Sequence, residues 1–176
     1  MFHTYRIQGI ILKRLNFGEA DRILTVFSQN QGKLKLIAKG VRKPVSRKKG
    51  HLELFNNSKM FCAKGKNIDI ITEAQTIDNF SNLKKNLNAV RIAYLFSELV
   101  DQLTAENQEQ TDVFKLLLYN FQSLNQKKVP KNIIFNFEKQ ILTFLGFGLP
   151  RIINRQSLES HIFSITEKPL NSKKIK

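Results

Sequence analysis

The sequence predicts an α+β protein, with a small β-barrel over residues 1–80 followed by an α-helical bundle over residues 81–150. Two patterns predict this division. Before residue 80, several short runs of alternating apolar and polar residues are separated by turn-forming residues, which is typical of a small barrel. After residue 80, apolar residues recur every three or four positions, as they do on the buried face of a helix. Residues 151–176 show weak periodicity, and we expect a short C-terminal extension that is partly disordered.

The strands of the barrel are expected where this alternation is clearest. In the strand that begins at Gly32, alternation places Leu34, Leu36 and Ala38 on one face, opposite Lys33, Lys35 and Ile37. The other candidate strands are Thr4–Leu15, Arg22–Ser28, Leu52–Phe55, Lys59–Ala63 and Ile68–Ala74. The same alternation points Phe27, Phe55 and Phe61 inward and leaves Tyr5 and Phe17 at the surface.

Three helices are expected in the second half. The first is capped by Asp78, Ser81 or Asn82 and carries two apolar stripes, which indicates a helix covered on more than one side. The second follows Thr111 or Asp112, and the third begins at Pro130. The expected stripes are Leu83-Leu87-Val90-Tyr94 and Ile92-Phe96-Leu99-Leu103 in the first helix, Phe114-Leu117-Phe121-Leu124 in the second, and Ile134-Phe137-Ile141-Leu145 in the third. The expected core includes Leu87, Tyr94, Leu99, Leu117, Phe121, Phe137 and Ile141.

A basic stretch follows the strand that begins at Gly32. Six basic residues and no acidic residue lie between Lys39 and Lys49, and Pro44 makes this part a loop. A strand that delivers unpaired cations into a loop predicts contact with a polyanion, although a solvated charge run is the alternative interpretation. The candidate phosphate-binding residues are Arg42, Lys43, Arg47, Lys48 and Lys49, with Lys39, Lys35 and Arg14 behind them.

The overall charge favours nucleic acid as that polyanion. The formal net charge is +15 and the pI is about 10.1, and residues 1–80 hold 15 basic and 6 acidic residues. A membrane-binding helix would carry its cations on one helical face, whereas here they lie on strands and loops, so no membrane partner is expected. The start of the chain has no apolar segment typical of a signal peptide, and we expect a cytoplasmic protein.

No pattern typical of an enzyme or a cofactor site is found. His3, His51 and His161 are far apart in the sequence, and Cys62 is the only cysteine, which excludes zinc sites built on two or more cysteines. Glu19 and Asp21 are expected to fix a turn rather than to act as an acid–base pair. No catalytic residue, metal or cofactor is therefore predicted, and binding is the function that remains.

Several ordered motifs resemble the RecO family of bacterial DNA repair proteins. They are Phe17-Gly18-Glu19-Ala20-Asp21, Ala38-Lys39-Gly40-Val41-Arg42, Pro44-Val45-Ser46, Gly50-His51-Leu52-Glu53-Leu54-Phe55, Ser97-Glu98-Leu99-Val100-Asp101, Phe137-Glu138-Lys139-Gln140-Ile141-Leu142 and Leu145-Gly146-Phe147. The resemblance covers about residues 5–150 in the family order. It implies an N-terminal OB-fold and an α-helical domain.

The resemblance also implies a function and partners. It implies a mediator of recombinational repair that catalyses no covalent step, binds single- and double-stranded DNA and anneals complementary strands. The implied protein partners are RecR, the acidic C-terminal tail of single-stranded DNA-binding protein and, indirectly, RecA. Many members carry a four-cysteine zinc motif after the Leu-Gly-aromatic segment, but residues 151–176 contain no cysteine. We therefore expect a short form that folds without zinc.

Two rival functions stay open from the sequence. OB barrels also bind RNA, so an RNA-binding protein is the first alternative. A nuclease is the second, although no cluster of carboxylates is found to support one. Binding to matched DNA and RNA would separate the first alternative from the DNA-repair function, and metal-dependent cleavage would reveal the second.

Overall fold

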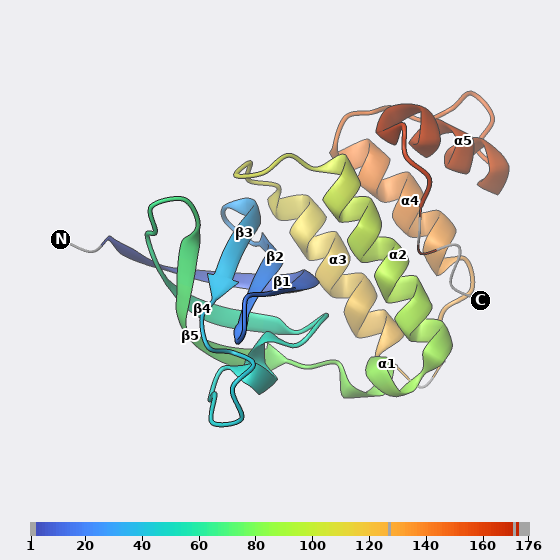
Figure 1. The fold of residues 1–176 in the computed structure, drawn as a ribbon. Helices are drawn as coiled ribbons and strands as arrows, with labels where there is room; N and C mark the ends of the chain where they lie inside the picture. The colour runs from blue at the N-terminus through green and yellow to red at the C-terminus, as the bar shows by residue number, and fades with distance from the viewer. Residues whose placement is uncertain (1–2, 127, 171, 173–176) are drawn as a thin grey trace. The chain divides into compact units, whose positions relative to one another are not determined.

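A computed structural model describes residues 3–126, 128–170 and 172 of the chain, and these residues form two compact units (Figure 1). The first unit lies within Met1–Phe80 and Ala105–Phe114, and the second within Ser81–Thr104 and Lys115–Lys176. The first unit consists mainly of strands and the second of helices, which confirms the α+β class.

The first unit contains a closed five-stranded barrel of the OB type. Its strand order is β1-β2-β3-β5-β4, and β4 pairs again with β1. Strands β3 and β5 run parallel, and the other neighbours are antiparallel. The elements are β1 (Thr4–Phe17), β2 (Asp21–Ser28), β3 (Gly32–Ala38), the 3₁₀ helix η1 (Lys49–Leu52), β4 (Asn57–Ala63) and β5 (Asp69–Asp78).

The barrel interior is filled by the inward residues of all five strands, as the alternation predicts. Cys62 is a fully buried member of this core, the role expected for a lone cysteine. Three partly buried residues pack against the core: Tyr5, Leu54 and Ala74. The core residues are Ile7, Ile11, Leu24, Val26, Leu34, Leu36, Ala38, Val41, Leu52, Met60, Cys62 and Ile71.

The prediction of a strand at Leu52–Phe55 is wrong. The chain forms η1 and then a turn in which Phe55 has a φ of 69°. The side-chain amide of Asn56 donates hydrogen bonds to the carbonyl oxygens of Gly50 and His51, at 3.0 and 3.3 Å. These local bonds hold the backbone in a turn and compete with strand pairing.

The alternation expected for β3 fails at two residues, because Lys33 and Ile37 are both buried. Near Lys33, the segment that precedes α3 (Thr111–Leu124) returns to the barrel, and the backbone N–H of Asn107 donates to the Lys33 carbonyl at 2.9 Å. At Gly32, which has a φ of +64°, an added Cβ would lie 1.7 Å from the Gln108 carbonyl oxygen. Glycine is required where two backbones approach so closely.

The second unit contains most of the helical residues. Phe96 and Phe137 stack within it, with ring centroids 3.9 Å apart. The helices are α1 (Ser81–Lys85), α2 (Leu87–Leu103), α3, which begins in the first unit, α4 (Ile133–Phe144) and α5 (Arg155–Thr166). No helix in the described part of the chain is both long and apolar enough to cross a membrane.

The first expected helix is interrupted at Asn86, which corrects its predicted phase. Asn86 is extended, and its side chain accepts a hydrogen bond from the backbone N–H of Ala89 at 3.2 Å, so it begins a new helix. The stripe that starts at Leu83 therefore does not continue. Leu87 is 72% exposed and Tyr94 39% exposed, so both were wrongly expected in the core. The other five expected core residues, Leu99, Leu117, Phe121, Phe137 and Ile141, are buried.

Two more helix predictions need correction. The third helix begins at Ile133 rather than Pro130, because Asn132 adopts a left-handed conformation with a φ of 61°. Helix α5 lies in the tail, where no helix was expected. Asn154 and Ser157 form a capping box at its start, and Leu158 and Ile162 are its buried residues. Residues 171 and 173–176, at the end of the extension that was expected to be partly disordered, lie outside the described residues.

Candidate nucleic-acid interface

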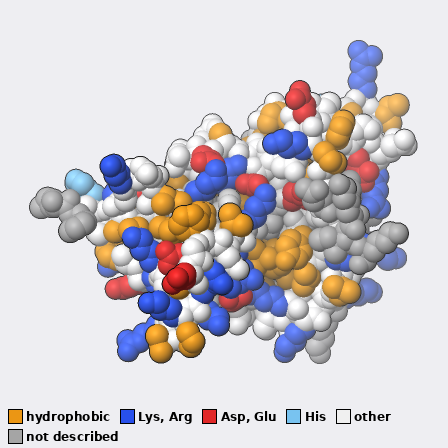
Figure 2. Space-filling view, in the orientation of Figure 1, with side chains coloured by type: hydrophobic (Ala, Val, Ile, Leu, Met, Phe, Trp, Pro, Cys, Tyr) orange, Lys and Arg blue, Asp and Glu red, His pale blue; other side chains and the backbone are white. Residues whose placement is uncertain are grey.

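The stretch of residues 39–49, called here the basic loop, is a turn-rich segment that follows β3 and ends at Lys49, the first residue of η1. The Asp21 side chain accepts a hydrogen bond from the Gly40 N–H at 2.7 Å, and the Arg42 N–H donates to the Ala20 carbonyl at 2.9 Å. Asp21 thus fixes the turn at Gly40; the expected role of Glu19 in a turn stays a prediction. Figure 2 shows Lys and Arg side chains at the edge of the barrel where Figure 1 draws this loop.

Two of the basic side chains hold the loop on the barrel. The Arg42 guanidinium donates to the Gly18 carbonyl at 3.1 Å, and the Lys48 ammonium donates to the Ile71 carbonyl of β5 at 2.8 Å. Burial lowers the pKa of Lys48, and the nearby Asp21 carboxylate opposes this shift. Arg42 and Lys48 were both predicted to bind phosphate, but their charged groups donate hydrogen bonds that position the loop.

The other four basic side chains of the loop are exposed to solvent. Within the described part of the chain, none of the four makes a side-chain hydrogen bond or ion pair. The acid nearest in sequence, Asp21, accepts its hydrogen bond from the Gly40 N–H. This exposed quartet consists of Lys39, Lys43, Arg47 and Lys49.

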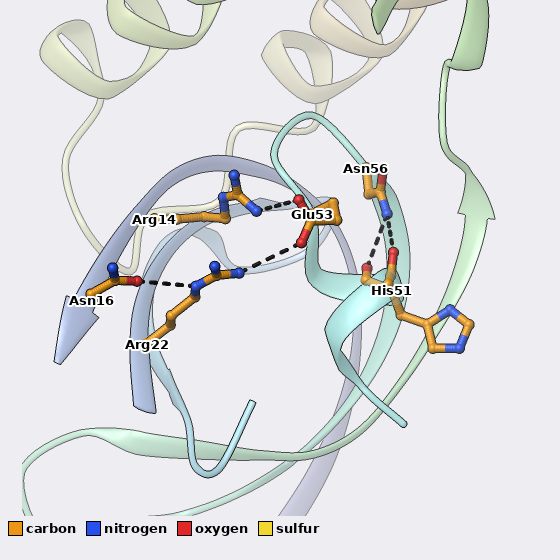
Figure 3. Close-up of polar contacts among 7 residues, drawn as sticks. Arg14, Asn16, Arg22, His51, Glu53 and Asn56 are labelled. Atoms are coloured by element: carbon orange, nitrogen blue, oxygen red, sulfur yellow. Dashed lines mark hydrogen bonds and ion pairs between the residues drawn. The ribbon is translucent and has the colours of Figure 1, made fainter. Parts of the chain in front are cut away.

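The last two predicted residues are paired with acids. Figure 3 shows Arg14 of β1 and Arg22 of β2 pointing toward Glu53, which forms ion pairs with both. The Lys35 ammonium lies 2.6 Å from the Glu106 carboxylate. The structure therefore separates the eight predicted residues into an exposed quartet, two loop anchors and two ion-paired residues.

Comparison with known families agrees with this architecture. The family model described as Recombination protein O N terminal matches residues 1–80, and the one described as Recombination protein O C terminal matches residues 84–150. The chain belongs to the RecO family.

Similar curated proteins carry the name DNA repair protein RecO. The protein from Roseiflexus sp. (strain RS-1) is 35% identical over 144 residues, which cover 82% of this chain and 50% of that protein. The protein from Dehalococcoides mccartyi (strain BAV1) is 34% identical over 145 residues, covering 82% and 57%, respectively. The protein from Trichodesmium erythraeum is 31% identical over 153 residues, covering 87% and 52%. The chain thus spans about half the length of these RecO proteins.

The zinc motif that the family resemblance implies does not fit the residues of this chain. After Gly148, His161 is the only histidine or cysteine, and its Nε2 lies 3.3 Å from the Phe147 carbonyl oxygen. Among the described residues, no group of three or more His, Cys, Asp or Glu side chains could hold a metal ion. A structural zinc site needs four such ligands, so the prediction that this chain folds without zinc stands as a prediction.

Sequence reasoning missed a second polar region of the barrel. Phe61, expected inside, lies on the outer face of β4, and the Arg6 guanidinium carbon is 5.6 Å from its ring centroid. These residues line a groove with a volume of about 710 Å³, which also includes Lys59. Phe27 and Phe55 are buried as expected, and Phe17, expected at the surface, is 52% exposed. The neighbours of Phe61 gave the signal, because Met60 and Cys62 alternate with it and both are buried.

Tyr5, expected at the surface, is half-buried. Its hydroxyl donates to the Asp69 carboxylate at 2.6 Å, and Lys64 donates to the same oxygen at 2.8 Å. Burial and the hydrogen bond to Asp69 both raise the pKa of Tyr5. Burial raises the pKa of Asp69, but hydrogen bonds from Lys64, Tyr5 and the Gly65 N–H outweigh it, so the net shift is downward. This cluster ties β1 to the β4–β5 turn and is structural.

Proposed function

We propose that this chain is a non-enzymatic DNA-binding protein of recombinational repair, which anneals complementary strands and helps to load a recombinase on single-stranded DNA in the cytoplasm. The observation that carries the proposal is the exposed quartet on an anchored loop of an OB-type barrel. Family membership supports the assignment to DNA repair.

The quartet suits annealing because exposed Lys and Arg side chains can neutralise phosphates of any sequence. Lys and Arg side chains that neutralise phosphates release counterions, and this gain is independent of sequence. Two complementary strands repel each other through their phosphates. Cations held on an anchored loop but mobile at their tips reduce that repulsion without fixing either strand, which leaves the bases free to pair. No bond is made or broken, so the proposal requires no catalytic residue.

Protein partners belong to the same proposal and rest on the family resemblance. They are RecR, the acidic tail of single-stranded DNA-binding protein and, indirectly, RecA. Because the chain spans about half the length of the RecO proteins it matches, each partnership needs a direct binding measurement with this chain.

Fluorescence anisotropy with three labelled ligands of one sequence tests the proposal: single-stranded DNA, duplex DNA and single-stranded RNA. We expect binding to both DNA forms that weakens as salt increases. The alternative function, an RNA-binding protein, predicts at least tenfold tighter binding to RNA, a difference of about 1.4 kcal/mol. That result, or binding to DNA that does not respond to salt, would contradict the proposal.

A further inference from the structure

The groove beside Phe61 lies on the outer face of three neighbouring antiparallel strands. Pairing of β1 with β4 places Arg6 opposite Phe61 and Gln8 opposite Lys59. Pairing of β4 with β5 places Glu73 opposite Phe61 and Gln75 opposite Lys59. Two rows of three outward side chains therefore cross the sheet, Arg6-Phe61-Glu73 and Gln8-Lys59-Gln75.

A turn closes one side of this groove. Gln29 and Asn30, between β2 and β3, belong to its lining, and the Gln29 N–H donates to the Gln8 carbonyl at 2.9 Å. That bond fixes the turn against β1. The volume of about 710 Å³ falls within the range of about 300–1,000 Å³ typical of sites for small ligands, so the groove can hold a nucleotide-sized group.

The side chains of the groove combine three kinds of chemistry. The Arg6–Phe61 pair presents a guanidinium and an aromatic ring, and both can stack on a nucleobase. Lys59 is exposed and makes no side-chain ion pair within the described residues, so its charge is available to a phosphate. The amides of Gln8 and Gln75 can donate and accept hydrogen bonds at base edges. Glu73 is acidic, so a phosphate is favoured at Lys59 rather than at the Glu73 end.

We infer that this groove binds an unpaired nucleotide of single-stranded nucleic acid, with its base against the Arg6–Phe61 pair and its phosphate at Lys59. The base faces of a duplex are covered by stacking, so a paired nucleotide cannot occupy the groove in this way. The exposed quartet contacts phosphates and therefore accepts either form. The groove thus adds a preference for single strands to the proposed function, on which this inference rests.

The first test compares single-stranded and duplex DNA binding by Phe61→Ala. Loss of one base–aromatic stack should weaken single-strand binding by about 5- to 150-fold, which corresponds to about 1–3 kcal/mol. Duplex binding should change less than twofold. Tyr119→Ala removes an exposed aromatic ring from α3 and serves as the matched control, with both affinities unchanged. Unchanged single-strand binding by Phe61→Ala, or an equal loss for both DNA forms, would overturn the inference.

A second variant keeps the aromatic bulk and reports on stacking directly. The chain has no tryptophan, so Phe61→Trp places a single tryptophan in the groove, whose emission can be excited selectively over that of the three tyrosines. Unlabelled single-stranded DNA should quench its emission, whereas duplex DNA should not, and Tyr119→Trp should respond to neither. Equal quenching by both DNA forms, or no quenching, would overturn the inference. If only these tests fail while the quartet still governs DNA binding, the proposed function stands without the groove.

Discussion

Replacing the whole exposed quartet with Ser should flatten the salt dependence of single-stranded DNA binding. For single strands, the slope of log affinity against log salt changes by about 0.7 for each phosphate that is neutralised. Four side chains that each contact one phosphate therefore account for about 3 units of slope, and their loss should also weaken binding at every sequence tested. For duplex DNA, the coefficient of about 0.9 gives a loss of nearly 4 units.

The structure supplies two controls for this prediction. A variant with Ser at Lys115, Lys131, Arg151 and Lys168 removes the same charge from exposed positions of the second unit, and its slope should be unchanged. Arg14→Gln with Lys35→Gln should change the slope by less than one phosphate, because both charges already face acids. Anisotropy titrations at salt concentrations from about 50 to 300 mM give the slope of log affinity against log salt for each variant. An unchanged slope for the quartet variant would show that the loop is only solvated.

Three further predictions concern stability and composition. Phe121→Ala should destabilise the protein by about 3–5 kcal/mol in denaturant titration, because this ring is fully buried, and a neutral effect would refute the assigned helix packing. The fold lowers the pKa of Asp69, so its carboxylate should stabilise the protein above its ordinary pKa of about 4, and this stabilisation should be lost as the pH falls further. Asp69→Asn should therefore reduce the acid dependence of the melting temperature. An identical profile of melting temperature against pH would contradict this. Elemental analysis of untagged protein should find no stoichiometric zinc, and a chelator should leave the melting temperature unchanged; one tightly held zinc per chain would overturn the interpretation of the tail.

Local pattern was enough to predict most of the barrel and the position of the basic loop. Alternation located the five strands because each buries one face against a shared core. It failed at Leu52–Phe55, where hydrogen bonds from the Asn56 amide stabilise a turn instead. It also failed at Lys33, because a segment more than seventy positions later in the chain returns to cover it.

The partners of the basic residues could not be read from local sequence. Arg14 and Glu53 are 39 positions apart, and Lys35 forms an ion pair with Glu106, which follows α2. Charge composition alone treats such cations as available to phosphate, and only the fold shows that they are paired. Phe61 was misplaced for a different reason, because its signal was local: its apolar neighbours Met60 and Cys62 are both buried and turn the ring outward.

The rate of annealing of two complementary, fluorescently labelled strands tests the central claim most directly. With the unmodified chain, we predict annealing faster than that of the bare strands, and the increase should be lost in the Ser variant of the exposed quartet but retained in the four-site control of the second unit. The same order of rates should hold when the strands are first coated with the cognate single-stranded DNA-binding protein. Equal rates with the unmodified chain and the quartet variant, or no acceleration by either, would contradict the account.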